Sequence, residues 1–222
     1  MQRISCRALL FDLDGVLVDS TPAVTRVWTA WSLKHGFDPD EVVRMAHGRT
    51  SLSTIVELLP NADHAAEDRD VERREIEDVD GVIPLPGAAE ILRKLSADRW
   101  AVVTSATHAL AEVRIHAAGL PVPKHLITAS DITRSKPDPE PYLLGAKSVG
   151  YAPGECIVIE DAPSGIRSAK SAGARVIALR TTAPDAELAA AGADWITPDL
   201  RSLSLANNAK GDKLFLCLDS YS

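Results

Sequence analysis

The sequence has no long apolar run, no excess of basic residues and few cysteines, and each absence excludes a class of protein. None of its apolar runs approaches the length of a membrane-spanning helix, so we expect no membrane-embedded segment. The N-terminal residues lack the apolar stretch and cleavage site of a signal peptide. Because the formal net charge is −7, a nucleic-acid-binding surface is not expected, and an anionic ligand would need local positive charge.

The cysteines are Cys6, Cys156 and Cys217, and they stand far apart in apolar runs. This spacing is typical of buried free thiols in a reducing compartment. It matches neither a disulfide framework nor a metal-ligand motif. Together with the missing signal peptide, it predicts a cytoplasmic protein.

A short apolar run near the N-terminus ends in two carboxylates. Residues 8–11 predict a buried strand of a parallel sheet, which leads into a loop containing Asp12, Asp14 and Gly15. Ligands of open parallel sheets bind beyond the carboxyl ends of the strands, and alternation directs Asp12 and Asp14 the same way. Two close carboxylates repel each other, so the pair indicates either a metal ion or one ionised and one protonated acid. The same pattern is also a common turn, so the interpretation depends on matching residues elsewhere.

The segment after this strand has helical periodicity and no strand signal, from residue 20 to residue 81. Trp28 and Trp31 recur at helical spacing, and we expect them in a core rather than in a ligand platform. Residues 63–79 carry charges of both signs, which predicts a solvated helix. Because the segment follows the acidic strand end directly, it can close over whatever binds there. Such closure needs no second subunit, so we expect a monomer or a weak dimer.

Strands and helices alternate with short connections in the remainder of the chain, which predicts a parallel sheet with right-handed crossovers. The predicted fold class is therefore α/β. A Rossmann-like, doubly wound core is formed by residues 1–19 and 82–222, and an all-helical cap is inserted at residues 20–81. Residues 203–206 and 214–218 indicate a possible C-terminal β-hairpin.

Polar residues follow several of the predicted strands, at the edge where parallel strands end together. Each has a simpler explanation alone: a surface lysine, or residues that cap a helix. Together they offer carboxylates for a hard cation such as Mg²⁺, and hydroxyl, amide and ammonium groups for a phosphoryl group. These residues are Asp12 and Asp14, Thr104 and Ser105, Lys136, and Glu160 and Asp161.

At these positions the sequence resembles the haloacid dehalogenase superfamily. FDLDG, VVTSA, SKPDPEPY and VIEDAPSGI match its four motifs in the family's order, and they extend over the whole predicted core. The helical insertion matches the family's small helical cap. Within the superfamily the chain looks most like phosphatases that act on small sugar and polyol phosphates. Val16 stands where many members carry Thr, although members with Val exist, including mutases.

The resemblance implies a role for each matching residue. Asp12 would be the nucleophile that forms an aspartyl-phosphate, and Asp14 would be the general acid and then the base. Asp12, the backbone carbonyl of Asp14, and Asp161 would bind Mg²⁺, with Glu160 bound directly or through water. The phosphate would be held by Thr104, the amide of Ser105, and Lys136.

Three further residues are candidates for substrate contacts. His47 and Arg49 lie in a polar loop of the predicted cap, and His108 lies just after the second motif. A polar loop explains the first two nearly as well, and a surface or helix-capping histidine is the simpler explanation for His108.

The resemblance leaves several functions open. The first is a Mg²⁺-dependent phosphomonoesterase acting on a small phosphorylated metabolite. The second is a phosphomutase of the β-phosphoglucomutase type, in which the phosphoryl group passes to a second sugar hydroxyl. A dehalogenase needs no metal, so the pair Glu160 and Asp161 argues against it. A non-enzymatic switch with a phosphorylatable aspartate has little use for a general acid at Asp14.

Overall fold

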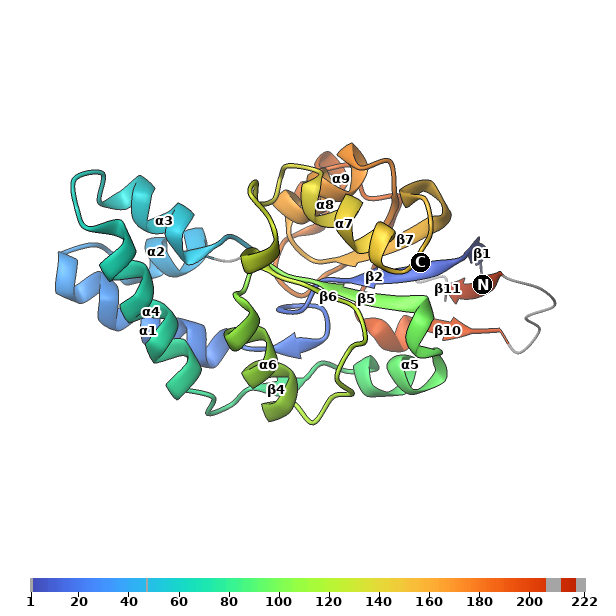
Figure 1. Ribbon diagram of the computed structural model, residues 1–222, viewed down its shortest axis with the longest axis horizontal. Helices are drawn as coiled ribbons and strands as arrows, with labels where there is room; N and C mark the ends of the chain where they lie inside the picture. Colours follow the sequence, from blue (N-terminus) through green and yellow to red (C-terminus); the bar gives the residue numbers. More distant parts are fainter. Residues whose placement is uncertain (1, 47, 207–212, 219–222) are drawn as a thin grey trace.

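The computed structural model describes residues 2–46, 48–206 and 213–218, which form an α/β core and a helical bundle at one end of it (Figure 1). The central sheet has six strands in the order β6-β5-β2-β7-β8-β9, and all neighbouring strands are parallel. Its strands are β2 (Ala8–Phe11), β5 (Trp100–Val103), β6 (Leu126–Ile127), β7 (Cys156–Glu160), β8 (Arg175–Leu179) and β9 (Trp195–Thr197). The predicted doubly wound core is confirmed.

Helices cover both faces of this sheet (Figure 1). One face carries α5 (Ala88–Lys94) and α6 (His108–Ala117), and the other carries α7 (Glu140–Ser148), α8 (Pro163–Ser171) and α9 (Asp185–Ala190). Alternate residues of β2 pack on opposite faces of the sheet. Leu9 and Phe11 pack in the apolar cluster that contains α5 and α6, while Ala8 and Leu10 pack in the cluster that contains α7, α8 and α9. This two-sided burial is the reason that the strand is apolar at every position.

A second, antiparallel sheet has the strand order β1-β11-β10 and lies at the end of the core away from the bundle (Figure 1). Its strands are β1 (Gln2–Cys6), β10 (Leu203–Leu205) and β11 (Leu214–Leu218). The predicted C-terminal hairpin strands do pair, and the residues that join them, 207–212, lie outside the described part. The strand β1 was not predicted, because its partner β11 is more than two hundred residues away in the chain.

The helical bundle consists of α1 (Thr21–His35), α2 (Pro39–Ala46), α3 (Ser51–Leu58) and α4 (His64–Glu77). It has its own apolar cluster, in which Trp28 and Trp31 are buried with ring centroids 5.4 Å apart. The prediction that these rings belong to a core is confirmed. We keep the division into a core of residues 1–19 and 82–222 and a cap of residues 20–81 as a proposal, which the separate cluster supports.

The bundle joins the core through two strands of two residues each, β3 (Val18–Asp19) and β4 (Ile83–Pro84), which pair antiparallel. The pair was not predicted from the sequence, because a strand of two residues has no periodicity and β4 contains Pro84. Four short 3₁₀ helices complete the described elements: η1 (Ala97–Arg99), η2 (Ala129–Asp131), η3 (Pro153–Glu155) and η4 (Leu200–Ser202). None of the described helices is both long and apolar enough to cross a membrane.

The helix α4 differs from its prediction as a solvated helix. Its residues Val71 and Glu75 are buried, and Trp31 of α1 donates a hydrogen bond of 3.0 Å to Glu67. The prediction was wrong for this face, because α4 packs against both α1 and the core helix α6. Mixed charge in the sequence does not reveal which charged side chains find buried partners in another element.

Candidate active site

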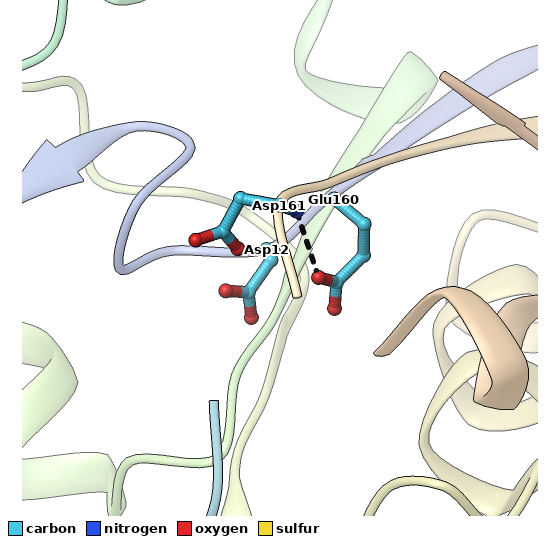
Figure 2. A group of neighbouring side chains, drawn as sticks. All are labelled: Asp12, Glu160 and Asp161. Atoms are coloured by element: carbon cyan, nitrogen blue, oxygen red, sulfur yellow. Dashed lines mark hydrogen bonds between the residues drawn. The ribbon is translucent and has the colours of Figure 1, made fainter. Parts of the chain in front are cut away.

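The central strands β2, β5 and β7 are neighbours, and they bring the predicted strand-end residues to one edge of the sheet. Asp12 follows β2, Thr104 and Ser105 follow β5, and Glu160 ends β7 directly before Asp161. Figure 2 shows the carboxyl groups of Asp12, Glu160 and Asp161 gathered at this edge. One carboxylate oxygen from each lies within 4.8 Å of the others, and all of these residues are buried.

Lys136 is buried among these acids rather than solvated. Its Nζ donates hydrogen bonds to Asp12 Oδ1 at 2.6 Å, to Glu160 Oε1 at 2.8 Å and to the Val103 carbonyl at 3.1 Å. Burial acts to lower the pKa of Lys136, but the negative charges of Asp12 and Glu160 outweigh it and raise the pKa above its ordinary value. The simpler interpretation as a surface lysine is therefore wrong.

Glu160 has donors on both carboxylate oxygens. Its Oε1 accepts from Lys136 and from the Tyr142 hydroxyl at 2.8 Å, and its Oε2 accepts from the amides of Asp161 at 3.0 Å and Ala162 at 3.1 Å. The helix α8 passes so close that a Cβ on Gly165 would lie 1.7 Å from Oε1. The carboxylate is thus fixed in place, and it holds Lys136 against Asp12.

Asp12 and Asp161 are the other two carboxylates of the cluster, and each has an oxygen that can still accept from a ligand. Burial raises the pKa of Asp12 to about 7, with Lys136 opposing this effect and Glu160 adding to it. Burial also raises the pKa of Asp161 well above its usual range, and the charges of Glu160 and Asp12 raise it further. Asp161 Oδ2 accepts a hydrogen bond from the Thr182 hydroxyl.

The residues of the cluster fit a metal ion. Three buried carboxylates face one buried ammonium, which leaves negative charge that a cation would balance. Of the three, Asp12 and Asp161 have oxygens with fewer protein donors than those of Glu160. The loop also requires glycine at position 15, because its φ is +79° and a Cβ there would lie 2.0 Å from Asp161 Oδ2.

Asp14 lies beside this cluster and has two donors of its own. Its Oδ1 accepts from Ser20 Oγ at 2.6 Å, and its Oδ2 accepts from Arg114 Nη1 at 2.9 Å. Arg114 Nη2 lies 3.5 Å from Oε2 of Glu75 on α4. Neither Arg114 nor Glu75 was predicted from the sequence as a site residue. The available signal was that Arg114 falls on the apolar face of α6, where its neighbours in the periodicity are buried.

A cavity of about 370 Å³ lies between the core and the helical bundle. Thr104, Ser105, Asp12 and Asp14 line it, and Thr104 Oγ1 accepts a hydrogen bond of 3.1 Å from the Ala106 amide. Lys136 is not among the lining residues and reaches the cavity wall through its contact with Asp12. The bundle contributes Trp28, Arg49, Asp68, Glu72 and Glu75 to the lining.

The three residues predicted as substrate contacts differ in their position relative to the cavity. Arg49 does line the cavity, with Nη2 2.7 Å from Glu57 Oε2. His108 does not line it: its side chain is 56% exposed and lies 3.3 Å from Glu112 one turn later on α6. A substrate contact for His108 stays a prediction, and its exposed position in the first turn of α6 agrees with the simpler explanation as a surface or helix-capping histidine. His47 lies outside the described residues.

Comparison with known proteins identifies the same family that the sequence motifs resemble. Residues 6–173 match the haloacid dehalogenase-like hydrolase family. Hexitol phosphatase A of Escherichia coli strain K12 is 40% identical over 212 residues, which cover 93% of this chain and 97% of that protein. Glycerol-1-phosphate phosphohydrolase 2 of Saccharomyces cerevisiae is 32% identical over 234 residues, covering 98% of this chain and 92% of that protein.

A solved structure of β-phosphoglucomutase from Clostridium difficile superimposes with a TM-score of 0.78, covering 90% of this chain and 93% of that one. Its sequence is 20% identical, so this likeness concerns the fold alone. The family match spans most of the chain, and it includes the strand ends and the Lys136 loop that form the site. The chain belongs to the haloacid dehalogenase-like hydrolase family.

Proposed function

We propose that this protein is a Mg²⁺-dependent phosphatase that hydrolyses a small sugar, polyol or related phosphomonoester through an aspartyl-phosphate. One observation carries the proposal. Asp12 and Asp14 both line the cavity, and a buried cation holds each of them: Lys136 at 2.6 Å from Asp12, and Arg114 at 2.9 Å from Asp14.

The proposed reaction has two steps. First, a carboxylate oxygen of Asp12 attacks phosphorus in line, the ester P–O bond breaks, and the leaving oxygen takes a proton from Asp14. Then Asp14 removes a proton from water, the water oxygen attacks the same phosphorus, and the bond to Asp12 breaks to release inorganic phosphate. Asp14 therefore needs a fixed position beside Asp12, which its bonds to Ser20 and Arg114 provide.

The cation and phosphate positions follow from the same cluster. Asp12, the backbone carbonyl of Asp14, and Asp161 would hold Mg²⁺, with Glu160 acting directly or through water. The bound ion would neutralise the negative charge that develops on the phosphoryl oxygens. Thr104, the Ser105 amide and Lys136 would hold those oxygens, and the bond from Lys136 to Asp12 keeps the ammonium beside the attacking atom.

The relatives support the substrate class. The E. coli and yeast proteins act, by their names, on hexitol phosphate and glycerol 1-phosphate, and this chain matches them over most of its length. Both names describe small hydroxyl-rich alcohols. The mutase alternative rests on a likeness of fold at 20% identity. We also propose a monomer or weak dimer, and a cytoplasmic location that the free thiols Cys6, Cys156 and Cys217 support.

Release of inorganic phosphate tests the proposal. The purified protein is incubated with a panel of sugar and polyol monophosphates, with Mg²⁺ and with a chelator. We expect turnover only with Mg²⁺, and its loss in Asp12→Asn but not in the matched control Asp98→Asn, whose side chain is 71% exposed. Conversion of glucose 1-phosphate to glucose 6-phosphate without phosphate release would identify a mutase instead.

A further inference from the structure

The wall that the bundle contributes to the cavity is acidic. Asp68, Glu72 and Glu75 of α4 all line the cavity, and their spacing of four and then three residues places them on one face of the helix. Asp12 and Thr104 line the same cavity from the core, at the ends of β2 and β5. The α4 carboxylates thus come from the bundle side of the cavity, whereas the residues that would bind the phosphoryl group come from the core.

Two of these carboxylates have hydroxyl partners and no cation. Asp68 Oδ1 accepts a hydrogen bond of 2.5 Å from Ser51, and Glu72 Oε1 accepts one from the Thr107 hydroxyl. Within the described part of the chain, no lysine, arginine or histidine forms an ion pair with Asp68 or Glu72. Each carboxylate keeps a second oxygen that can accept from a ligand.

The cations of the cavity do not compensate this charge. Among the described lining residues, Arg49 and Arg114 are the basic ones. Arg49 pairs with Glu57 at 2.7 Å, and Arg114 pairs with Asp14 at 2.9 Å and with Glu75 at 3.5 Å. Arg114 is buried between two carboxylates and Arg49 forms a partly exposed pair with Glu57, so neither guanidinium group forms an ion pair with Asp68 or Glu72.

We propose that Asp68 and Glu72 select the alcohol half of the substrate. They accept hydrogen bonds from an uncharged, hydroxyl-rich group, and they repel a second anionic group. A carboxylate accepts hydrogen bonds and donates none, so it suits vicinal hydroxyls. In a partly buried cavity, like charges repel more strongly than in water. This inference rests on the proposed phosphatase activity. It adds that the alcohol released from the substrate is uncharged.

The same wall disfavours phosphomutase chemistry. Passing a phosphoryl group from Asp12 to a sugar that already carries phosphate produces a bisphosphate, whose second phosphate must lie against the cavity. That group would lie against Asp68 and Glu72 with no unpaired arginine among the described lining residues. Sugar bisphosphates and phosphorylated carboxylic acids are therefore expected to be poor substrates.

A pair of esters that differ in one group tests the proposal. Glycerol 1-phosphate and 3-phosphoglycerate have the same length, but a hydroxymethyl group in the first is a carboxylate in the second. The kcat and KM for both are measured with Mg²⁺ for the wild-type protein, for Glu72→Gln and for Glu77→Gln. Glu77 is the matched control, because it lies on α4, its side chain is 61% exposed, and it pairs with Arg73 away from the cavity.

For the wild-type protein we expect kcat/KM to favour glycerol 1-phosphate by about tenfold or more, because one like charge is brought into a partly buried cavity. Glu72→Gln keeps the acceptor for Thr107 and removes the charge, so this ratio should fall several-fold, mainly through a lower KM for 3-phosphoglycerate. Glu77→Gln should keep the wild-type ratio. Equal kcat/KM values in the wild type, or an unchanged ratio in Glu72→Gln, overturn this inference alone. Absence of turnover on every ester overturns the proposed function.

Discussion

Arg114 donates a hydrogen bond of 2.9 Å to Asp14, a residue 100 positions earlier in the chain. Only 7% of the Arg114 side chain is exposed, and its other terminal nitrogen lies 3.5 Å from the equally buried Glu75. Asp14 belongs to the core and Glu75 to the helical bundle, so a single guanidinium links the proposed acid–base group to the bundle. We assign Arg114 a positioning role, since it acts on the reaction through Asp14.

Replacing Arg114 with methionine should lower both stability and turnover. The change leaves Asp14 and Glu75 without their cation, and uncompensated buried charge costs about 3 kcal/mol of unfolding free energy. Adding Glu75→Gln to Arg114→Met should recover part of that stability but not kcat, because Asp14 keeps only its bond from Ser20 and still lacks Arg114. Denaturant unfolding and steady-state kinetics measure the two effects. If the double variant recovers kcat along with stability, Arg114 is structural only.

The Lys136→Ala variant should reduce turnover and weaken binding of inorganic phosphate, the reaction product, together. Its ammonium contacts Asp12 and Glu160, so its removal takes positive charge from the phosphoryl position and frees the attacking carboxylate. Product inhibition by inorganic phosphate gives the binding constant. Lys147→Ala, an exposed lysine of α7, is the control. A loss of thermal stability with kcat and phosphate affinity unchanged would make Lys136 a structural residue.

The pH dependence of stability should change when Glu75 is replaced with glutamine. Burial raises the pKa of Glu75 above its ordinary 4.5, although Arg114 opposes this. As pH rises past 4.5, the unfolded chain ionises this group before the folded chain does, so the folded state loses relative stability up to the raised pKa. The unfolding free energy of wild type minus that of Glu75→Gln should therefore fall with rising pH in this range. A difference that is independent of pH contradicts the raised pKa.

The strand ends were predictable from sequence because each motif is local. The apolar run before Asp12 and the one before Glu160 are buried at every position, and parallel strands end together, so their polar residues had to meet. The positions of Asp12 and Asp161 relative to each other follow from this rule, whereas Lys136 reaches them from the loop before α7. Their chemical roles stay predictions until they are measured.

Contacts between distant elements were not predictable in the same way. The pairing of β1 with β11 and the contact of Arg114 with Glu75 depend on how separate parts pack. His108 shows that closeness to a motif in the sequence does not decide whether a side chain reaches the cavity. Its closeness in sequence to the second motif suggested a place in the site, but the first turn of α6 directs the side chain to solvent and to Glu112.

The most direct test of the account is detection of phosphate on Asp12. The protein is mixed with a hydrolysed ester and Mg²⁺, quenched in acid within the turnover time, digested and analysed by mass spectrometry. We predict one added phosphoryl group on the peptide that contains Asp12, and neither phosphopeptide nor turnover in Asp12→Asn. Phosphate release by Asp12→Asn at the wild-type rate, with no phosphopeptide in either protein, would contradict the account.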